Sequence, residues 1–366
     1  MLIFQNSRLG NMFVYYSKHK NSSKKQYPTI IEELCHQFSL DDLKKSTNNF
    51  DEDRLIGHGF DSKVYRGYLK HNGESDYPIA VKVMKRRDRR ELMKNIIELH
   101  CQLHHPNLIS LIGFCENKYV SCLVYEYMCN GSLHDRLLSR DMESLSWKKR
   151  LEISIGVAKG LHYLHTGAKR PIFNRDITTH NILLDSKMVP KLKLEISLQG
   201  KFCKLGQKSI EVDIISVRLN ALLLTGTMGY MAPEYAKYGT VTDKCDVYSF
   251  GRVLLEVACT NYNLTTMDKM MMFRLQEEIA FLEDHTEVLY EDILKGDIFW
   301  DKFLDAEIID PVLMRLIALP CLEVYMDIAK RCLKSDPNER PAMGEVEVEL
   351  EHALALQEVE EKCWKE

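Results

Sequence analysis

Residues 169–184 read KRPIFNRDITTHNILL, and this stretch decides the fold. It contains Asp176 and, five positions later, Asn181, followed directly by the apolar run Ile182-Leu183-Leu184. The polar pair and the apolar run together form the most informative pattern in the chain.

The spacing of Asp176 and Asn181 resembles the catalytic loop of protein kinases, H-R-D followed by four residues and N. The resemblance implies that Asp176 accepts the proton of a substrate hydroxyl and that Asn181 helps to hold magnesium against the phosphates of ATP. Two positions depart from the family pattern. Asn174 stands where the family has His, and Thr178 stands where it usually has Lys. The sequence therefore predicts a kinase fold with altered chemistry.

The composition bounds the class of protein. A chain of 366 residues suits a two-lobed domain with a short extension, and 45% apolar with 28% charged residues are globular values. A net charge of −4 gives no reason to expect nucleic-acid binding or affinity for anionic membranes. Eleven cysteines without paired or zinc-site spacing favour a reducing compartment over a disulfide framework.

The N-terminal sequence carries no signal-peptide pattern, and no stretch approaches the roughly 18 apolar residues of a membrane span. Met1-Leu2 also excludes the start of an N-myristoylation motif. We expect residues 1–38 to form a solvated tail, with lipid contact by its basic residues as the alternative. The protein is then either cytoplasmic or peripheral at the plasma membrane.

Two longer phrases carry the family resemblance further. FSLDDLKKSTNNFDEDRLIGHG, residues 38–59, resembles the segment that leads into plant receptor-like kinase domains, and SWKKRLEISIGVAKGLHYLHTGAKRPI, residues 146–172, resembles their first long C-lobe helix. Ser39 and Asp42 have capping-box spacing, which predicts a helix that begins at residue 40.

The resemblance implies an α+β, two-lobed protein-kinase-like fold. We expect a kinase-like domain over residues 39–350, with a small β-rich N-lobe at 54–127 and a large helical C-lobe at 128–350. A separate, charged, surface helix should occupy residues 351–366.

A nucleotide site is expected in the N-lobe. Gly57, Gly59 and Val64 fit a phosphate-covering hairpin of the form G-x-G-x-x-G-x-V, with Ser62 at the third glycine. A lone G-x-G is also an ordinary tight turn. It gains weight here because the strand Ile79-Ala80-Val81-Lys82 follows, ending in the lysine that in kinases contacts the α- and β-phosphates.

The glutamate that orients this lysine in kinases is missing. Counting ten residues back from Pro106 gives Ile96 at the glutamate position. Glu98 lies two residues further on, about 200° around a helix, and faces another way. We therefore predict that Lys82 lacks its usual carboxylate partner.

The resemblance also places the adenine pocket. Leu123 to Met128 resembles the hinge strand, with Tyr125 as gatekeeper and Glu126 to Met128 offering backbone groups to adenine. The apolar side chains that sandwich the base are those of Val64, Ala80 and Leu183. Because none of these contacts needs a metal, we predict weak ATP binding with little magnesium dependence, and magnesium only if the protein is active.

The metal-binding D-F-G motif of kinases is absent at its expected place. Without a gap, Leu194 stands for the Asp, Glu195 for the Phe and Ile196 for the Gly. Leucine has no oxygen for magnesium, which leaves Asn181 as a partial metal ligand. A register shift by one residue would instead put Glu195 at the metal position.

Active kinases stack four apolar side chains through the core, and here three of the positions are polar: His100, Asn174 and Glu195, with Leu111 as the fourth. An unpaired buried polar group costs about 1–3 kcal/mol. Our hypothesis is that Glu195 pairs with His100. The alternative is that Glu195 turns out to water.

The C-lobe pattern is otherwise complete. The resemblance implies that Asp246 binds the catalytic-loop backbone and that Arg340 pairs with Glu234 of the A-P-E segment. Thr225 and Thr227 could be phosphorylated by another kinase, with Arg175 as a phosphate contact, although structural roles suit them equally. The apolar stretch 214–224 is either a partner-binding surface or an aggregation hazard.

Two functions follow. The first is a pseudokinase that retains ATP binding and acts as a scaffold or allosteric partner of other signalling proteins, such as an active receptor kinase. The second is a low-activity Ser/Thr protein kinase with Asp176 as base and Asn181 or Glu195 holding one metal.

Overall fold

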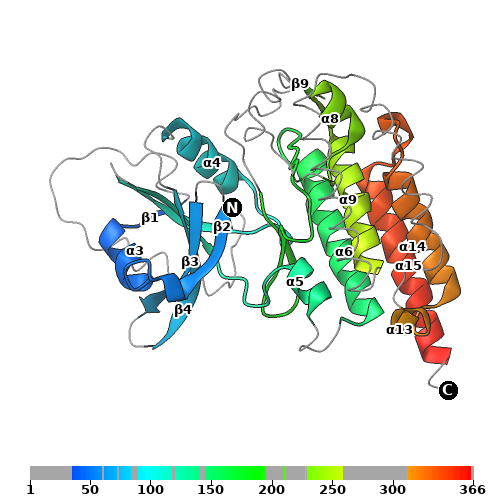
Figure 1. Ribbon diagram of the computed structural model, residues 1–366, viewed down its shortest axis with the longest axis horizontal. Helices are drawn as coiled ribbons and strands as arrows, with labels where there is room; N and C mark the ends of the chain where they lie inside the picture. The colour runs from blue at the N-terminus through cyan, green and yellow to red at the C-terminus, as the bar shows by residue number, and fades with distance from the viewer. Residues whose placement is uncertain are drawn as a thin grey trace, which may run out of the picture. The chain divides into compact units, whose positions relative to one another are not determined.

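The computed structural model describes residues 35–59, 62–71, 74–84, 90–117, 120–139, 145–194, 209–211, 227, 229–258 and 311–363. The chain divides into two compact units, Met1–His104 with Ile109–Tyr127, and His105–Leu108 with Met128–Glu366. A sheet dominates the first unit and helices dominate the second, which confirms the predicted α+β class (Figure 1).

The first unit contains a mixed sheet. Among the described residues its strand order is β1-β5-β6-β4-β3-β2, with β1 parallel to β5 and the other neighbours antiparallel. The strands are β1 (His36–Gln37), β2 (Leu55–Gly59), β3 (Ser62–His71), β4 (Glu74–Met84), β5 (Leu111–Glu116) and β6 (Ser121–Glu126). The unit also contains α4 (Arg90–Gln102).

One face of this sheet forms the core with helix α3 (Leu40–Ser46). Side chains alternate between the two faces of a strand, so Ile79, Val81 and Val83 of β4 are all buried on the same face. Leu43 of α3 is fully buried in this cluster. The predicted start of α3 is confirmed, because the Ser39 hydroxyl accepts a hydrogen bond from the backbone N–H of Asp42 at 3.1 Å.

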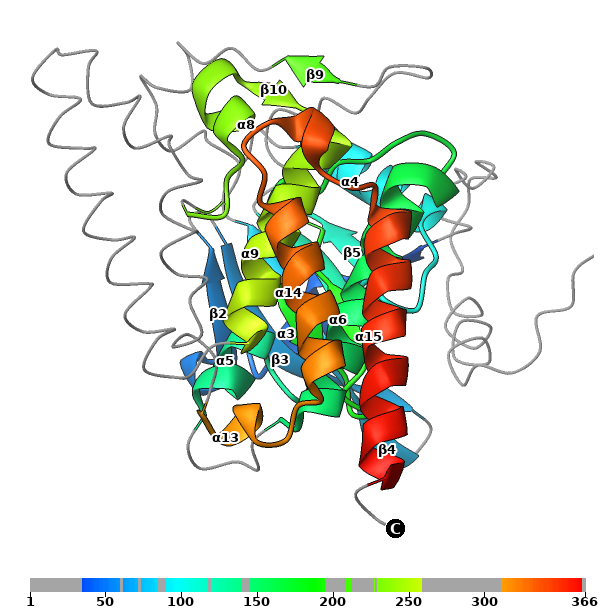
Figure 2. The ribbon, with the colours of Figure 1, turned by 90° about the vertical axis from the view of Figure 1, so that its right-hand side faces the viewer.

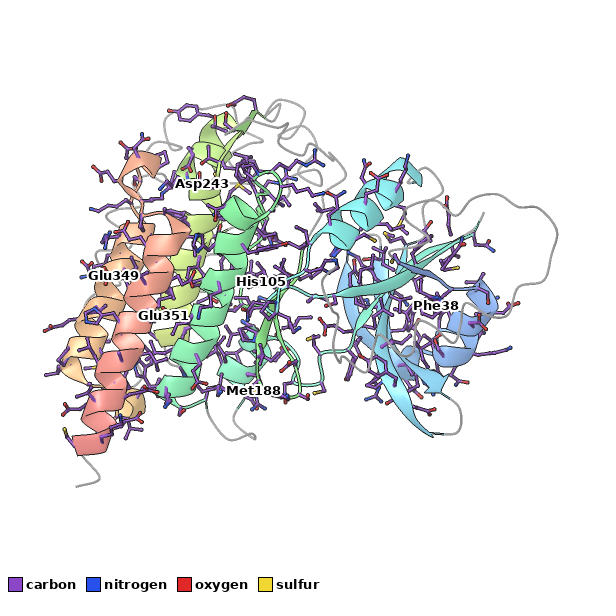
Figure 3. The ribbon with its side chains drawn as sticks, turned by 180° about the vertical axis from the view of Figure 1, so that it is seen from behind. Phe38, His105, Met188, Asp243, Glu349 and Glu351 are labelled. Atoms are coloured by element: carbon purple, nitrogen blue, oxygen red, sulfur yellow. The ribbon has the colours of Figure 1, made fainter. Side chains whose placement is uncertain are left out.

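The ordered sheet begins before residue 39, inside the range expected to be a tail. The backbone N–H of Phe38 donates to the carbonyl of Phe114 at 2.8 Å, and the Phe38 side chain is buried (Figure 3). Gly113 allows this approach, since an added Cβ would lie only 2.2 Å from the His36 carbonyl oxygen. The tail interpretation therefore does not hold for residues 36–38, and residues 1–34 lie outside the described part.

Long helices pack side by side in the second unit (Figure 2). They are α6 (Trp147–His162), α9 (Asp243–Ala258), α14 (Leu319–Cys332) and α15 (Met343–Cys363). Ser146 caps α6, and its hydroxyl accepts a hydrogen bond from the N–H of Lys149 at 3.3 Å. Every residue of α9 from Cys245 to Ala258 is buried, which makes α9 the central helix of the unit.

Helix α15 corrects the expected surface helix at 351–366. It begins at Met343, and Leu350, Ala353 and Gln357 are fully buried. Its charged side holds ion pairs, such as Glu351 to Lys159 of α6 at 2.7 Å (Figure 3). A charged composition therefore conceals a buried stripe that packs against α6 and α14.

Shorter elements complete the second unit. They are α5 (Leu133–Leu138), β7 (Ile182–Leu184), β8 (Pro190–Leu192), β9 (Ile210–Glu211), α8 (Pro233–Tyr238), β10 (Thr240–Val241) and α13 (Pro311–Met314). The apolar stretch 214–224, Glu195, Ile196 and Thr225 lie outside the described residues.

Candidate nucleotide and catalytic site

The loop that carries Asp176 is anchored to α9 by Asp246. The fully buried Asp246 carboxylate accepts from the backbone N–H groups of Asn174 at 2.9 Å and Arg175 at 2.7 Å, which confirms the predicted contact. The Nε2 atom of His165 lies 2.9 Å from the same carboxylate. Arg175 has a φ of 67°, and its backbone is held in this left-handed conformation by the bond to Asp246.

A second buried polar cluster, formed by Glu256, Arg252 and Tyr230, contacts the catalytic loop through Thr179. The Glu256 carboxylate accepts from the hydroxyl of Thr179 at 2.7 Å and from that of Tyr230 at 2.8 Å. Arg252, one helical turn away, pairs with Glu256 at 3.0 Å. Burial, together with the negative charge of Glu256, raises the pKa of Tyr230 well above its usual range, so its hydroxyl remains a donor.

Asp176 is held through both carboxylate oxygens. Oδ1 accepts from the Thr227 hydroxyl at 2.7 Å, and Oδ2 accepts from the Asn181 side-chain amide at 2.6 Å. The same amide donates to the Asp176 carbonyl at 3.0 Å. The structure therefore brings the two residues of the catalytic-loop pattern into direct contact.

The side-chain oxygen of Asn181 faces a lysine that the sequence interpretation overlooked. Lys193 Nζ lies 3.4 Å from Asn181 Oδ1, and the Lys193 backbone N–H donates to the Asn181 carbonyl at 2.9 Å. Residues 181 and 193 face each other across the β7–β8 hairpin, and the register of that hairpin is visible only in the structure, so no sequence signal pointed to this contact.

The β7–β8 hairpin fixes the position of Leu194. Its turn is closed by Asp185, whose side chain accepts from the N–H of Val189 at 2.9 Å, and Met188 there has a φ of 61° (Figure 3). The strands pair without a register shift, Ile182 opposite Leu192. Leu194 follows two residues later and is buried, 9% exposed.

Asn174 is buried, 2% exposed, yet its polar atoms are satisfied. Its amide donates to the Lys193 carbonyl at 3.0 Å, and its side-chain oxygen accepts from the Asp176 N–H at 3.3 Å. Thr178, 1% exposed, accepts from the Asn181 N–H at 3.2 Å. The two atypical loop residues therefore bind backbone groups and lose no hydrogen bond on burial.

In the first unit, the expected nucleotide residues share the face of the sheet opposite α3. Lys82 is paired with Val64 on β3, and Ala80 two residues earlier points the same way. All three are half-buried. Gly57 is paired with Val64 as well, which brings the glycine hairpin next to this face, and Gly59 is paired with Ser62.

Helix α4 carries an apolar side chain at the expected glutamate position. Ile96 is buried, 6% exposed, whereas Glu98 points outward and lies 3.9 Å from Lys94. His100 is buried and makes an edge-to-face contact with Tyr125 at 5.5 Å between ring centroids. The hypothesis that His100 pairs with Glu195 stays a prediction, because Glu195 is outside the described residues. Leu111, the fourth residue of the side-chain stack expected in active kinases, lies in β5.

The remaining predicted residues are placed as follows. The Glu126 carboxylate accepts from the Ser110 N–H at 2.8 Å within the first unit, while Met128 is buried and Leu183 half-buried in the second. Arg340 donates two hydrogen bonds to Glu234, at 2.7 and 2.8 Å, which confirms that predicted pair.

Comparison with known proteins identifies the class. Residues 50–296 match the family described as protein tyrosine and serine/threonine kinase, and the chain belongs to this family. A domain of this class binds ATP in general.

The sequence relatives are plant receptor-like kinases. The chain is 37% identical to the receptor-like protein kinase ANXUR1 of Arabidopsis thaliana over 342 residues, 93% of this chain and 36% of that protein. It is 36% identical to FERONIA of the same organism over 362 residues, 98% of this chain and 37% of that protein. The chain thus spans about a third of the length of the curated relatives it matches.

Among the residues that the structure describes, which exclude Glu195, the donor chemistry of the site does not fit magnesium. Magnesium requires oxygen ligands, whereas Leu194 offers none and the side-chain oxygen of Asn181 already faces an ammonium group. Within the described ranges, no three His, Cys, Asp or Glu side chains gather as a metal cluster would require. Nor does any helix in those ranges combine the length and the apolar character needed to cross a membrane.

Proposed function

We propose that this chain is a protein-kinase-fold signalling domain that binds ATP weakly but transfers phosphate poorly or not at all. The observation that carries the proposal is the buried Leu194 at the end of an unbroken β7–β8 hairpin. The regular pairing through Lys193 favours the ungapped register, in which Leu194 occupies the metal-ligand position.

The physical argument concerns charge. Phosphoryl transfer depends on positioning and on neutralising the phosphate oxygens. The chain keeps Asp176, Asn181 and Lys82, but Ile96 and Leu194 are apolar side chains at two positions where the family places carboxylates. Asn174 and Thr178, the two departures in the catalytic loop, are engaged with the backbone and supply no compensating charge.

Nucleotide binding does not need these missing groups. The family resemblance assigns apolar contacts with a purine to Val64 and Ala80 in the first unit and to Leu183 in the second, and Lys82 of the first unit carries a positive charge suited to phosphate. We therefore expect ATP to bind weakly and with little help from magnesium.

The biological role we propose is that of a scaffold or allosteric partner for other signalling proteins, for example an active receptor kinase. The contacts that support the large unit, Glu234 with Arg340 and Asp246 with the loop, are intact although the chemistry is altered. Among the possible partners we do not include nucleic acid, since the net charge is −4. We propose that the protein acts in the cytoplasm or at the inner face of the plasma membrane.

Phosphotransfer is the direct test. Purified wild-type chain and the Asp176→Ala variant are incubated with labelled ATP, magnesium or manganese, and a generic protein substrate. We expect equal, background incorporation for both proteins, because the charge-neutralising groups are missing.

The second candidate is a low-activity Ser/Thr kinase. This candidate is favoured by the position of Asp176, because its two carboxylate oxygens accept hydrogen bonds from Asn181 and Thr227. Incorporation by the wild type that disappears in Asp176→Ala would establish this candidate and contradict the first.

A further inference from the structure

The further inference concerns Lys193 and rests on the proposed function. Asn181, Leu183, Lys191 and Lys193 share one face of the β7–β8 hairpin, because Leu183 pairs with Lys191 and the N–H of Lys193 bonds to the carbonyl of Asn181. The opposite face is apolar: Ile182, Leu184, Pro190 and Leu192 are all buried.

The face with Lys193 is the one expected to meet the nucleotide. It carries Leu183, the predicted floor of the adenine pocket, and Asn181, the predicted partial metal ligand. The half-buried Lys193 places its ammonium nitrogen 3.4 Å from Asn181 Oδ1. A positive charge therefore lies beside the oxygen atom that would otherwise coordinate a metal.

We propose that the Lys193 ammonium substitutes for a divalent metal and binds a phosphate group of adenosine di- or triphosphate. An ammonium group neutralises one phosphate charge and has three hydrogens to donate, so it can keep Asn181 while binding a phosphate oxygen. The same group disfavours magnesium at Asn181, because two cations at this separation repel each other and one ligand oxygen is already engaged.

The backbone of Lys193 is held by two hydrogen bonds. The Lys193 N–H is bonded to the Asn181 carbonyl, and the Lys193 carbonyl accepts from the Asn174 amide at 3.0 Å. Asn174, at the family's His position, therefore acts as a positioning residue for Lys193. In this proposal Lys193 takes over the charge-neutralising role of the metal. Two of the departures from the family pattern adjoin it, because Asn174 binds its carbonyl and Leu194 follows it in the chain.

The test measures binding rather than activity. ATP and adenosine are titrated separately into the full chain by calorimetry, in EDTA and again with magnesium. We expect Lys193→Met to weaken ATP binding about 10-fold, the scale of one charge-assisted hydrogen bond, and to leave adenosine binding unchanged. Lys187→Met, an exposed lysine in the turn of the same hairpin, is the matched control and should leave both affinities unchanged, while Lys193→Arg should retain most of the preference for ATP.

Two results would overturn the proposal. The first is that the ratio of ATP affinity to adenosine affinity is the same in Lys193→Met as in the wild type. Failure of the wild type to bind ATP at all counts as the same result. The second needs no variant: a 10-fold or larger gain in wild-type ATP affinity on adding magnesium. Failure of the proposed function is separate, since it would appear as Asp176-dependent phosphotransfer whatever the behaviour of Lys193.

Discussion

At the scale of single residues, the second unit contains a buried ion pair between Arg340 and Glu234. The Arg340 side chain is fully buried and donates to both Glu234 oxygens, as well as to the carbonyls of Lys334, Lys244 and Ser335. A planar guanidinium suits this many directed acceptors, whereas an ammonium group does not. The pair joins the A-P-E segment to the turn before α15.

Replacing Arg340 should strongly destabilise the fold. We expect Arg340→Ala to lower the free energy of unfolding by about 3–5 kcal/mol, because Glu234 and several carbonyl groups lose their partner while still largely buried. Chemical denaturation measures this change. Arg331→Ala is the control: the Arg331 side chain is 34% exposed and pairs at the surface with Asp327, at 3.7 Å, and with Glu345, so its loss should cost no more than about 1 kcal/mol. Equal effects of the two substitutions would contradict the prediction.

At the scale of elements, two segments near the ends of the described chain are structural parts of their units. Gln357 of α15 is fully buried, accepts from the Ala318 N–H at 3.0 Å and donates to the Leu316 carbonyl at 2.9 Å. It thereby ties the C-terminal half of α15 to the start of α14. In the first unit, β1 is tied to β5 through the close approach at Gly113.

Gln357 gives a test of the C-terminal helix. We expect Gln357→Ala to reduce the free energy of unfolding by about 1–3 kcal/mol, since the buried N–H of Ala318 and the part-buried carbonyl of Leu316 lose their partner. Val359, 60% exposed on the same helix, is the control, and Val359→Ala should change it by less than about 0.5 kcal/mol. Removal of residues 351–366 without loss of stability would show that α15 is not the core element described above.

Gly113 gives the corresponding test of β1. An added methyl group would lie 2.2 Å from the His36 carbonyl and 2.6 Å from the Phe38 ring, so Gly113→Ala should displace β1 and cost about 1–3 kcal/mol. Gly57→Ala is the control, because its added methyl group would meet Val64 at an ordinary 3.7 Å. Thermal unfolding of both variants, with hydrogen exchange at Phe38 as a local probe, distinguishes the two cases.

At the scale of the whole molecule, each unit lacks charged groups that phosphotransfer uses in the family. In the second unit Thr178 already stands where the family usually has Lys. The first unit has Ile96 where a glutamate would orient Lys82, and the second has Leu194 where an aspartate would bind magnesium. Both side chains are buried, at 6% and 9% exposure. A substitution that restores the carboxylate at one of these two positions therefore leaves the other position without its carboxylate.

Leu194→Asp tests this division. The new carboxylate should make ATP binding respond to magnesium, because it supplies an oxygen ligand, yet it should not restore phosphotransfer while Ile96 remains. Calorimetry with and without magnesium measures the first effect, and labelled ATP measures the second. Phosphotransfer by Leu194→Asp alone would show that Lys82 does not require a glutamate at position 96.

Much of the architecture could be predicted from local signals. The cap at Ser39 follows from a short motif at a set spacing, and the pairing of Glu234 with Arg340 follows from the family resemblance; the structure confirms both. The alternation that puts Ala80 and Lys82 on one face also follows from strand periodicity, whereas the place of Val64 on that face depends on the register of β3 against β4.

What the sequence determined by itself is the kinase class and the identity of the replaced residues, because motif spacing and side-chain chemistry are local properties. Only the tertiary structure decided that residues 36–38 join a sheet, that α15 has a buried stripe, and that Lys193 lies beside Asn181. Each of these is a contact between segments distant along the chain or across a hairpin. Backbone pairing and burial create such contacts, and no single stretch of residues encodes them.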